Sequence, residues 1–103
     1  MEKVFVTGTL PVALIKLDGQ TTIKSKEIVM TQLTAIEFLQ SQQTLLEGQF
    51  ISIGDLATMT KLVDENGNEH DITYDMLGNS SKSNLDYLNS KKVELEAKEK
   101  AES

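Results

Sequence analysis

The residues best suited to chemistry lie in one polar stretch, DENGNEHD, which spans residues 64 to 71. It contains His70, the single histidine of the chain, with a carboxylate on either side. Such a histidine is a candidate general base, and clustered carboxylates are candidate calcium ligands. The stretch lacks the D-x-[DN]-x-[DN]-G spacing and the distal glutamate of a calcium loop. We therefore interpret it as a solvated turn centred on Asn66-Gly67, with no catalytic residue and no metal.

The composition removes several other kinds of site. The chain has no cysteine, which excludes disulfides and thiolate metal sites. Its six glycines are scattered singly and form neither a dinucleotide-binding nor a phosphate-binding pattern. No nucleophile stands beside a base, and no convergent pair of titratable groups is evident. The sequence therefore predicts a protein that is not an enzyme and that holds no cofactor.

The charge indicates what kind of partner to expect. The formal net charge is −6, and all ten basic residues are lysines. The absence of arginine argues against nucleic-acid recognition, and the acidic balance argues against an anionic membrane surface. No apolar run approaches the roughly 20 residues of a membrane span, and the first residues do not resemble a signal peptide. We expect a cytosolic protein that binds another protein.

An antiparallel hairpin is predicted at the N-terminal end. Two runs rich in branched apolar residues, 10–17 and 21–30, flank Asp18-Gly19, a dipeptide typical of tight hairpin turns. Their alternation of apolar residues is imperfect, which predicts a bulge near Ser25–Glu27. Pro11 has no N–H to donate, so we expect it at a strand start or on an edge strand.

Helical signals follow the hairpin. Thr34 and Glu37 form a capping-box pattern, which predicts a helix from Ala35 to about Glu47. The same pattern at Ser52 and at Ser83 predicts two further helix starts. The predicted helical segments are 35–47, 53–63, a short turn at 72–77, and a final helix from Ser83. We favour a helix-to-helix loop between the second and third segments, although a pair of short strands across residues 60–72 stays open.

These elements together predict the fold class and the extent of the domain. We expect an α+β fold in which the N-terminal antiparallel β-hairpin packs on three to four short α-helices. A chain of 103 residues is one domain. Beyond Leu95 the final helix has few apolar residues and many charges, so we expect a single domain over 1–95 and a frayed charged tail over 96–103.

Several motifs in this order carry a family resemblance. A strand LPVAL precedes a glycine turn in DGQTTI, and QLTAIE at 32–37 begins a helix that continues into the amide-rich QSQQ. Near the end stand Asp86, Tyr87 and Leu88. In these features the sequence resembles the tail assembly chaperone family of Mu-like contractile-tailed phages and prophages. The resemblance covers about residues 8 to 95.

The resemblance implies a non-enzymatic viral assembly factor in the cytoplasm of the bacterial host. Members of the family bind the tape-measure protein that sets tail length, and keep its apolar helices soluble during tail morphogenesis. A longer form of the chaperone, made by ribosomal frameshifting, is a second implied partner. Weak homo-oligomerisation stays open.

The apolar faces of two predicted helices are the expected contact surface for such a partner. Gln42 lies within the apolar arc of the first helix, either as an amide bonded to the hairpin or as a polar recognition point. The predicted partner-binding residues are Phe38, Gln42, Leu45, Leu88 and Leu95.

Two other classes of protein remain as alternatives. One is a structural tail-completion or connector protein, which would be found in purified virus particles. The other is an acidic DNA mimic that inhibits a nuclease or repressor, as the net charge of −6 suggests. Lysines are interspersed with the acids along the chain, which argues against a phosphate-like row of carboxylates.

Overall fold

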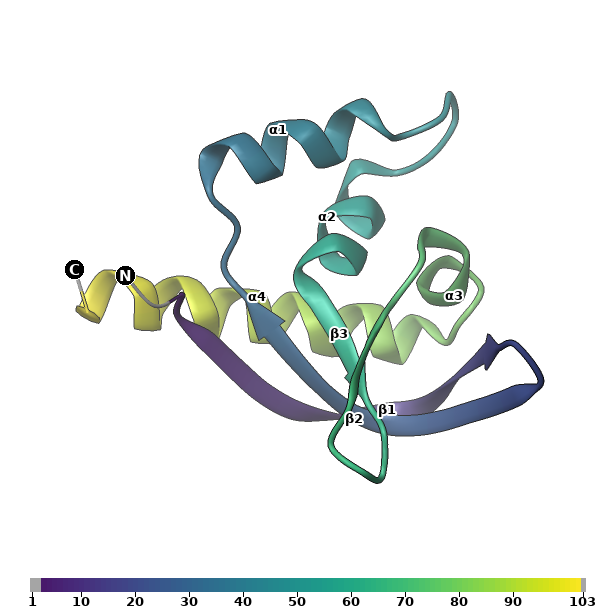
Figure 1. Cartoon of the computed structure of the whole chain (residues 1–103). Coiled ribbons are helices and arrows are strands. Elements are labelled where there is room, and N and C mark those ends of the chain that lie inside the picture. Colours follow the sequence, from purple (N-terminus) through teal and green to yellow (C-terminus); the bar gives the residue numbers. More distant parts are fainter. Residues whose placement is uncertain (1–2, 103) are drawn as a thin grey trace.

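The computed structural model describes residues 3–102, which form an α+β fold with a four-stranded antiparallel sheet. The strands, in the spatial order β1-β2-β3-β4, are β1 (Phe5–Asp18), β2 (Thr21–Thr31), β3 (Thr60–Val63) and β4 (Glu69–Asp71). The helices are α1 (Ala35–Gln43), α2 (Ile51–Met59), α3 (Tyr74–Gly78) and α4 (Lys82–Glu102). In Figure 1, α1 lies farthest from the hairpin, with α2 between α1 and α4. The predicted fold class and the N-terminal hairpin are confirmed.

The β1–β2 hairpin turns at Gly19-Gln20, one residue later than the predicted Asp18-Gly19, because Asp18 still pairs with Thr21. Gly19 has a φ of 64°, which favours glycine. The strands pair regularly at both ends, but the register shifts between the pairs Thr9–Glu27 and Leu14–Ser25. The predicted bulge is therefore present opposite Ser25–Glu27, and the extra residues belong to β1. The Ser25 hydroxyl donates to the Val63 carbonyl at 2.5 Å, which ties the irregularity to β3.

One face of the sheet forms the core with α2, α3 and α4. The bulge allows residues of both parities on β2 to face this core, because it changes the register between Ile23 and Ile28. The buried apolar residues are Val6, Leu10, Leu14, Ile23, Ile28, Met30, Leu56, Ala57, Met59, Leu62, Ile72, Leu77, Leu88 and Leu95.

Helix α4 runs along β1, an edge strand, and its side chains bond the strand's free backbone groups (Figure 1). The Asn84 amide accepts from the Val12 N–H at 3.0 Å and donates to the Val12 carbonyl at 2.9 Å. The Tyr87 hydroxyl accepts from the Thr9 N–H at 2.9 Å, and Lys98 donates to the Phe5 carbonyl. These bonds satisfy groups that would otherwise be available to another strand.

The region between α2 and α3 differs from the favoured prediction of a helix-to-helix loop. It is a hairpin, in which β3 pairs with β2 on one side and with β4 on the other. Helix α2 correspondingly spans 51–59 instead of 53–63, and its N-cap is Phe50, which makes no side-chain cap bond. The run TKLV at 60–63 alternates between buried and half-buried residues, and pairing with β2 outweighs its helical pattern.

The ends of two other helices also differ from prediction. Helix α1 ends at Gln43, four residues before the expected end. Helix α4 begins at Lys82, so Ser83 lies inside it and does not cap it. Residues 96–102, which were expected to fray, continue the helix, and Ser103 lies outside the described residues. The anchoring bond from Lys98 to β1 lies within this extension.

Candidate protein-binding site

Helix α1 is held mainly by its N-terminus. The Thr34 hydroxyl accepts from the Glu37 N–H, and the Glu37 carboxylate accepts from the Thr34 N–H, so the predicted capping box is confirmed. Glu37 also pairs with Lys3 at 2.6 Å. The Lys3 hydrogen bond, followed by the backbone bond at Thr34, lowers the pKa of Glu37 to about 2. None of the residues of α1 is buried, so local bonds rather than core packing define this helix.

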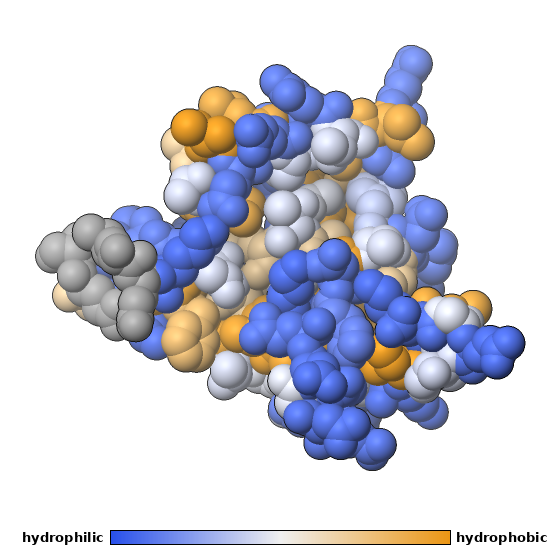
Figure 2. Space-filling model, viewed as in Figure 1, coloured by the Kyte–Doolittle hydropathy of each residue, from blue (hydrophilic) through white to orange (hydrophobic). Residues whose placement is uncertain are grey.

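Large apolar side chains are exposed over α1, the loop that follows it, and the start of α2. Five of them are 54–70% exposed: Ile36, Leu39, Leu46, Phe50 and Ile51. Figure 2 shows two groups of hydrophobic atoms in the upper part of the molecule, where Figure 1 places α1 and this loop, with more hydrophilic atoms between the two groups. We call these five residues the α1 apolar surface. Several large exposed apolar side chains in one region of a small domain make that region a candidate protein-interaction site.

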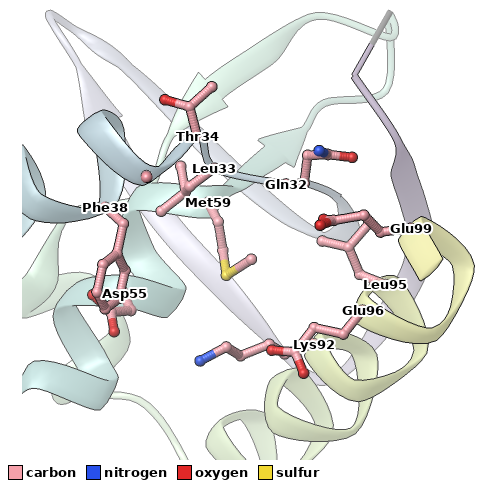
Figure 3. A pocket seen from close by; sticks show the side chains of 11 residues that line it. Gln32, Leu33, Thr34, Phe38, Asp55, Met59, Lys92, Leu95, Glu96 and Glu99 are labelled. Atoms are coloured by element: carbon pink, nitrogen blue, oxygen red, sulfur yellow. The ribbon is translucent and has the colours of Figure 1, made fainter. Parts of the chain in front are cut away.

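A cleft with a volume of about 430 Å³ lies between α1, α2 and α4 (Figure 3). Its apolar lining includes Phe38 from α1, Met59 from α2 and Leu95 from α4. Its polar lining comes mainly from one helix: Lys92, Glu96 and Glu99 of α4. Gln32, Leu33, Thr34, Ala35 and Asp55 complete the lining.

Asp55 is the one acidic residue of the cleft that is buried. Asp55 is only 6% exposed, and its Oδ1 atom has no hydrogen-bond partner among the described residues. Burial raises the pKa of the Asp55 carboxyl above its usual range, while the positive charge of Lys92 and a polar contact with Ser41 act in the opposite direction. In Figure 3 the Lys92 side chain extends across the cleft from α4.

The structure divides the predicted partner-binding residues into two groups. Phe38 is 38% exposed and lines the cleft, so it is accessible as predicted. Gln42 and Leu45 are half-buried. Leu45 lies against α2 at Gly54, where an added Cβ would lie 2.7 Å from Leu45 Cδ2. Helix α1 packs mainly on α2, so the structure gives no support to a bond between Gln42 and the hairpin.

Leu88 and Leu95 require a correction. They are 0% and 1% exposed and belong to the core of the chain itself. Leu95 forms part of the cleft wall, whereas Leu88 does not line the cleft. The amphipathic pattern of α4 is accounted for by packing on the sheet, so neither leucine offers an exposed surface to a partner.

The cleft acids and the α1 apolar surface were not predicted as a site. Asp55 was assigned to a capping box with Ser52, which does not form because α2 begins at Ile51. Its sequence signal was an acid inside the apolar run ISIGDLATM. Leu46 was expected at the end of the first helix, and Phe50 and Ile51 fell between the two predicted helices. The structure places Leu46 and Phe50 in the loop and Ile51 at the start of α2, and all three are exposed.

Residues 64–68 of the polar stretch form the tight turn between β3 and β4, and residues 69–71 form β4. The Asp64 carboxylate accepts from the N–H groups of Asn66 and Asn68 and lies 2.8 Å from His70 Nε2. The bond to His70 is the main cause that lowers the pKa of Asp64. Within residues 3–102 no group of three histidine, aspartate or glutamate side chains is arranged to hold a metal ion. These contacts give His70 a structural role in the turn.

Comparison with protein-family models, with curated proteins and with solved structures found no match to this chain. In the described part of the chain, no helix combines the length and the apolar character that crossing a membrane requires. The fold and the site define a small α+β domain that exposes an apolar surface beside an acidic cleft.

Proposed function

We propose that this chain is an assembly chaperone of a contractile-tailed phage or prophage. It binds the tape-measure protein in the cytoplasm of the bacterial host during tail morphogenesis, and it catalyses no reaction. A longer frameshifted form of the chaperone is a second candidate partner. The proposal is supported by the motifs of the strand, helix start and final helix, and by the exposed apolar side chains of α1.

The observation that carries the proposal is the contrast between α1 and its surroundings. The helix is capped and well defined, yet it buries none of its residues, and its neighbourhood exposes the five residues of the α1 apolar surface. Such a helix contributes little to the stability of the domain itself. A partner that covers its apolar side chains would account for their presence. A helical, apolar partner fits this surface by packing helix against helix.

The acidic charge of the chain suits a reversible chaperone. A net charge of −6 keeps a protein with an exposed apolar surface soluble by mutual repulsion between copies. The structural alternative, a tail-completion or connector protein, would instead remain bound in the finished particle.

The proposal is tested by co-expression with the neighbouring tail genes, followed by affinity purification through a tag on this chain. We expect the wild-type chain to retain the tape-measure protein, and purified particles to lack the chain. A double substitution, Ile36→Ser with Leu39→Ser, is expected to reduce the retained partner at least tenfold.

A matched control is available on the hairpin, where Ile15 and Leu17 are 57% and 75% exposed. The double substitution Ile15→Ser with Leu17→Ser removes a similar exposed apolar area and is expected to leave capture unchanged. Equal capture by both double variants would show that the α1 apolar surface does not bind the partner. The presence of the chain in purified particles would favour the structural alternative.

A further inference from the structure

The cleft contains a hydrogen-bonding group that none of the described residues satisfies. Asp55 Oδ1 is almost inaccessible and accepts no hydrogen bond from the described residues. Buried carboxylates are normally paired, because removing such a group from water without a partner costs free energy. Asp55 lines the cleft between α1 and α4, and Figure 3 shows its side chain behind the ring of Phe38. A donor that entered the cleft would therefore find an acceptor ready for it.

The charges around the cleft favour a cationic donor. Asp55, Glu96 and Glu99 contribute three carboxylates to its lining, whereas Lys92 is its one basic residue. Glu96 and Glu99 are both exposed at the wall of the cleft. An ionised donor makes a shorter and stronger bond to a carboxylate than a neutral one does.

The size of the cleft limits what enters it. A helix with its side chains is about 10–12 Å across, and a cleft of about 430 Å³ takes side chains rather than a whole helix. The apolar lining from Phe38, Met59 and Leu95 suits the long hydrocarbon stem of a lysine or arginine. Because α1 buries no residue, a small displacement of Phe38 to uncover Asp55 disturbs little of the core.

We propose that the cleft binds a lysine or arginine from the apolar face of the partner helix, whose cationic group donates to Asp55. The helix itself lies on the α1 apolar surface. This inference rests on the proposed function and adds to it a rule of recognition: bound segments carry a basic residue within an otherwise apolar stripe.

The test uses overlapping 20-residue synthetic peptides that cover the tape-measure protein encoded beside this chain, with binding measured by fluorescence anisotropy. We expect the wild-type chain to bind a subset of peptides that carry a lysine or arginine within an apolar stripe. Asp55→Asn is expected to weaken the binding of these peptides at least tenfold. Asp75→Asn, which changes an exposed aspartate on α3, is the matched control and is expected to bind like the wild type.

A substitution in the peptide tests the same contact without altering the protein. Replacing the basic residue of the tightest-binding peptide by methionine is expected to weaken its binding to the wild-type chain tenfold. The same replacement is expected not to weaken binding to the Asp55→Asn variant, which already lacks the contact. Circular dichroism and thermal unfolding confirm that each variant is folded. The double variant Glu96→Gln with Glu99→Gln alters exposed acids and is expected to weaken the binding of the basic peptides about threefold. It replaces Asp55→Asn as the test variant if Asp55→Asn does not fold.

The outcomes separate the two proposals. If peptides bind regardless of basic residues, and Asp55→Asn binds them as the wild type does, the cleft inference is overturned while the proposed function stands. If no peptide and no tape-measure protein binds, both are overturned. If sedimentation shows that the cleft mediates self-association, which Asp55→Asn abolishes and peptides do not disrupt, the occupant is a second copy and the inference is wrong.

Discussion

Helices α1 and α4 both carry apolar residues at helical spacing, but these residues differ in burial. Leu88 and Leu95 of α4 are buried in the core, and Asn84 of the same helix bonds the edge of β1. Helix α1 has a complete capping box but buries none of its residues. The comparison shows that an apolar stripe predicts that a helix will be covered by protein, without indicating which protein covers it.

The largest difference between the two helices is expected on truncating an apolar side chain. Leu88→Ala should lower the free energy of unfolding by about 2–5 kcal/mol, because it leaves a cavity in the core. Leu39→Ala on α1 should change it by less than about 0.5 kcal/mol, because this side chain is exposed. Urea unfolding followed by circular dichroism measures both. Comparable losses would mean that α1 also belongs to the core.

The contact between α4 and the β1 edge is expected to give the next largest effect. Asn84→Ala removes both bonds to the Val12 backbone and leaves a partly buried donor and acceptor unpaired. We expect a loss of about 1–3 kcal/mol in the free energy of unfolding. Asn89→Ala, at an exposed position of the same helix, is the control and should change it by less than about 0.5 kcal/mol. Equal effects would show that the edge bonds contribute no stability.

The cleft between the two helices predicts a pH-dependent effect of Asp55→Asn. The pKa of Asp55 is raised in the folded chain from an ordinary value of 3.8, so the unfolded chain releases this proton first as pH rises. The stability of the wild type therefore falls as pH rises from about 3.8 through the raised pKa. The advantage of Asp55→Asn over the wild type should grow across this window and level off above it. Urea unfolding at a series of pH values measures it, and an advantage that is independent of pH would contradict the account.

The smallest global effect is expected from the caps. Thr34→Ala removes the side-chain cap of α1, worth about 1 kcal/mol, yet the global free energy of unfolding should stay unchanged because α1 is only loosely attached. Amide hydrogen exchange in α1 should instead accelerate about fivefold. Thr73→Ala removes the corresponding cap of α3, which buries Leu77, and should lower global stability by about 1 kcal/mol. A global loss from Thr34→Ala would place α1 within the cooperative core.

Local signals allowed much of the fold to be predicted. Asp18-Gly19 located the hairpin turn to within one residue, and Thr34 with Glu37 located the start of α1, because both features depend on neighbouring residues alone. The β3–β4 hairpin was missed because its strands are short and are stabilised by pairing with β2, which lies far away in sequence. Ser83 fits the capping pattern, but α4 begins one residue earlier, which no local rule decides.

The candidate site was predictable only in part. Phe38 was identified from the apolar arc of its helix, and the structure leaves it accessible. Leu88 and Leu95 were assigned to a partner because periodicity does not distinguish a core from an interface. The cleft at Asp55 brings together α2 and α4, which are joined only in the three-dimensional fold.

The account's central claim is that α4 and the sheet form the stable body while α1 and its loop receive the partner. Hydrogen–deuterium exchange of this chain, alone and in complex with the tape-measure protein, tests the claim most directly. We predict that binding slows exchange across residues 35–51 and leaves the β1–β2 hairpin turn unchanged. Protection that is confined to the hairpin, with residues 35–51 exchanging as in the free chain, would contradict it.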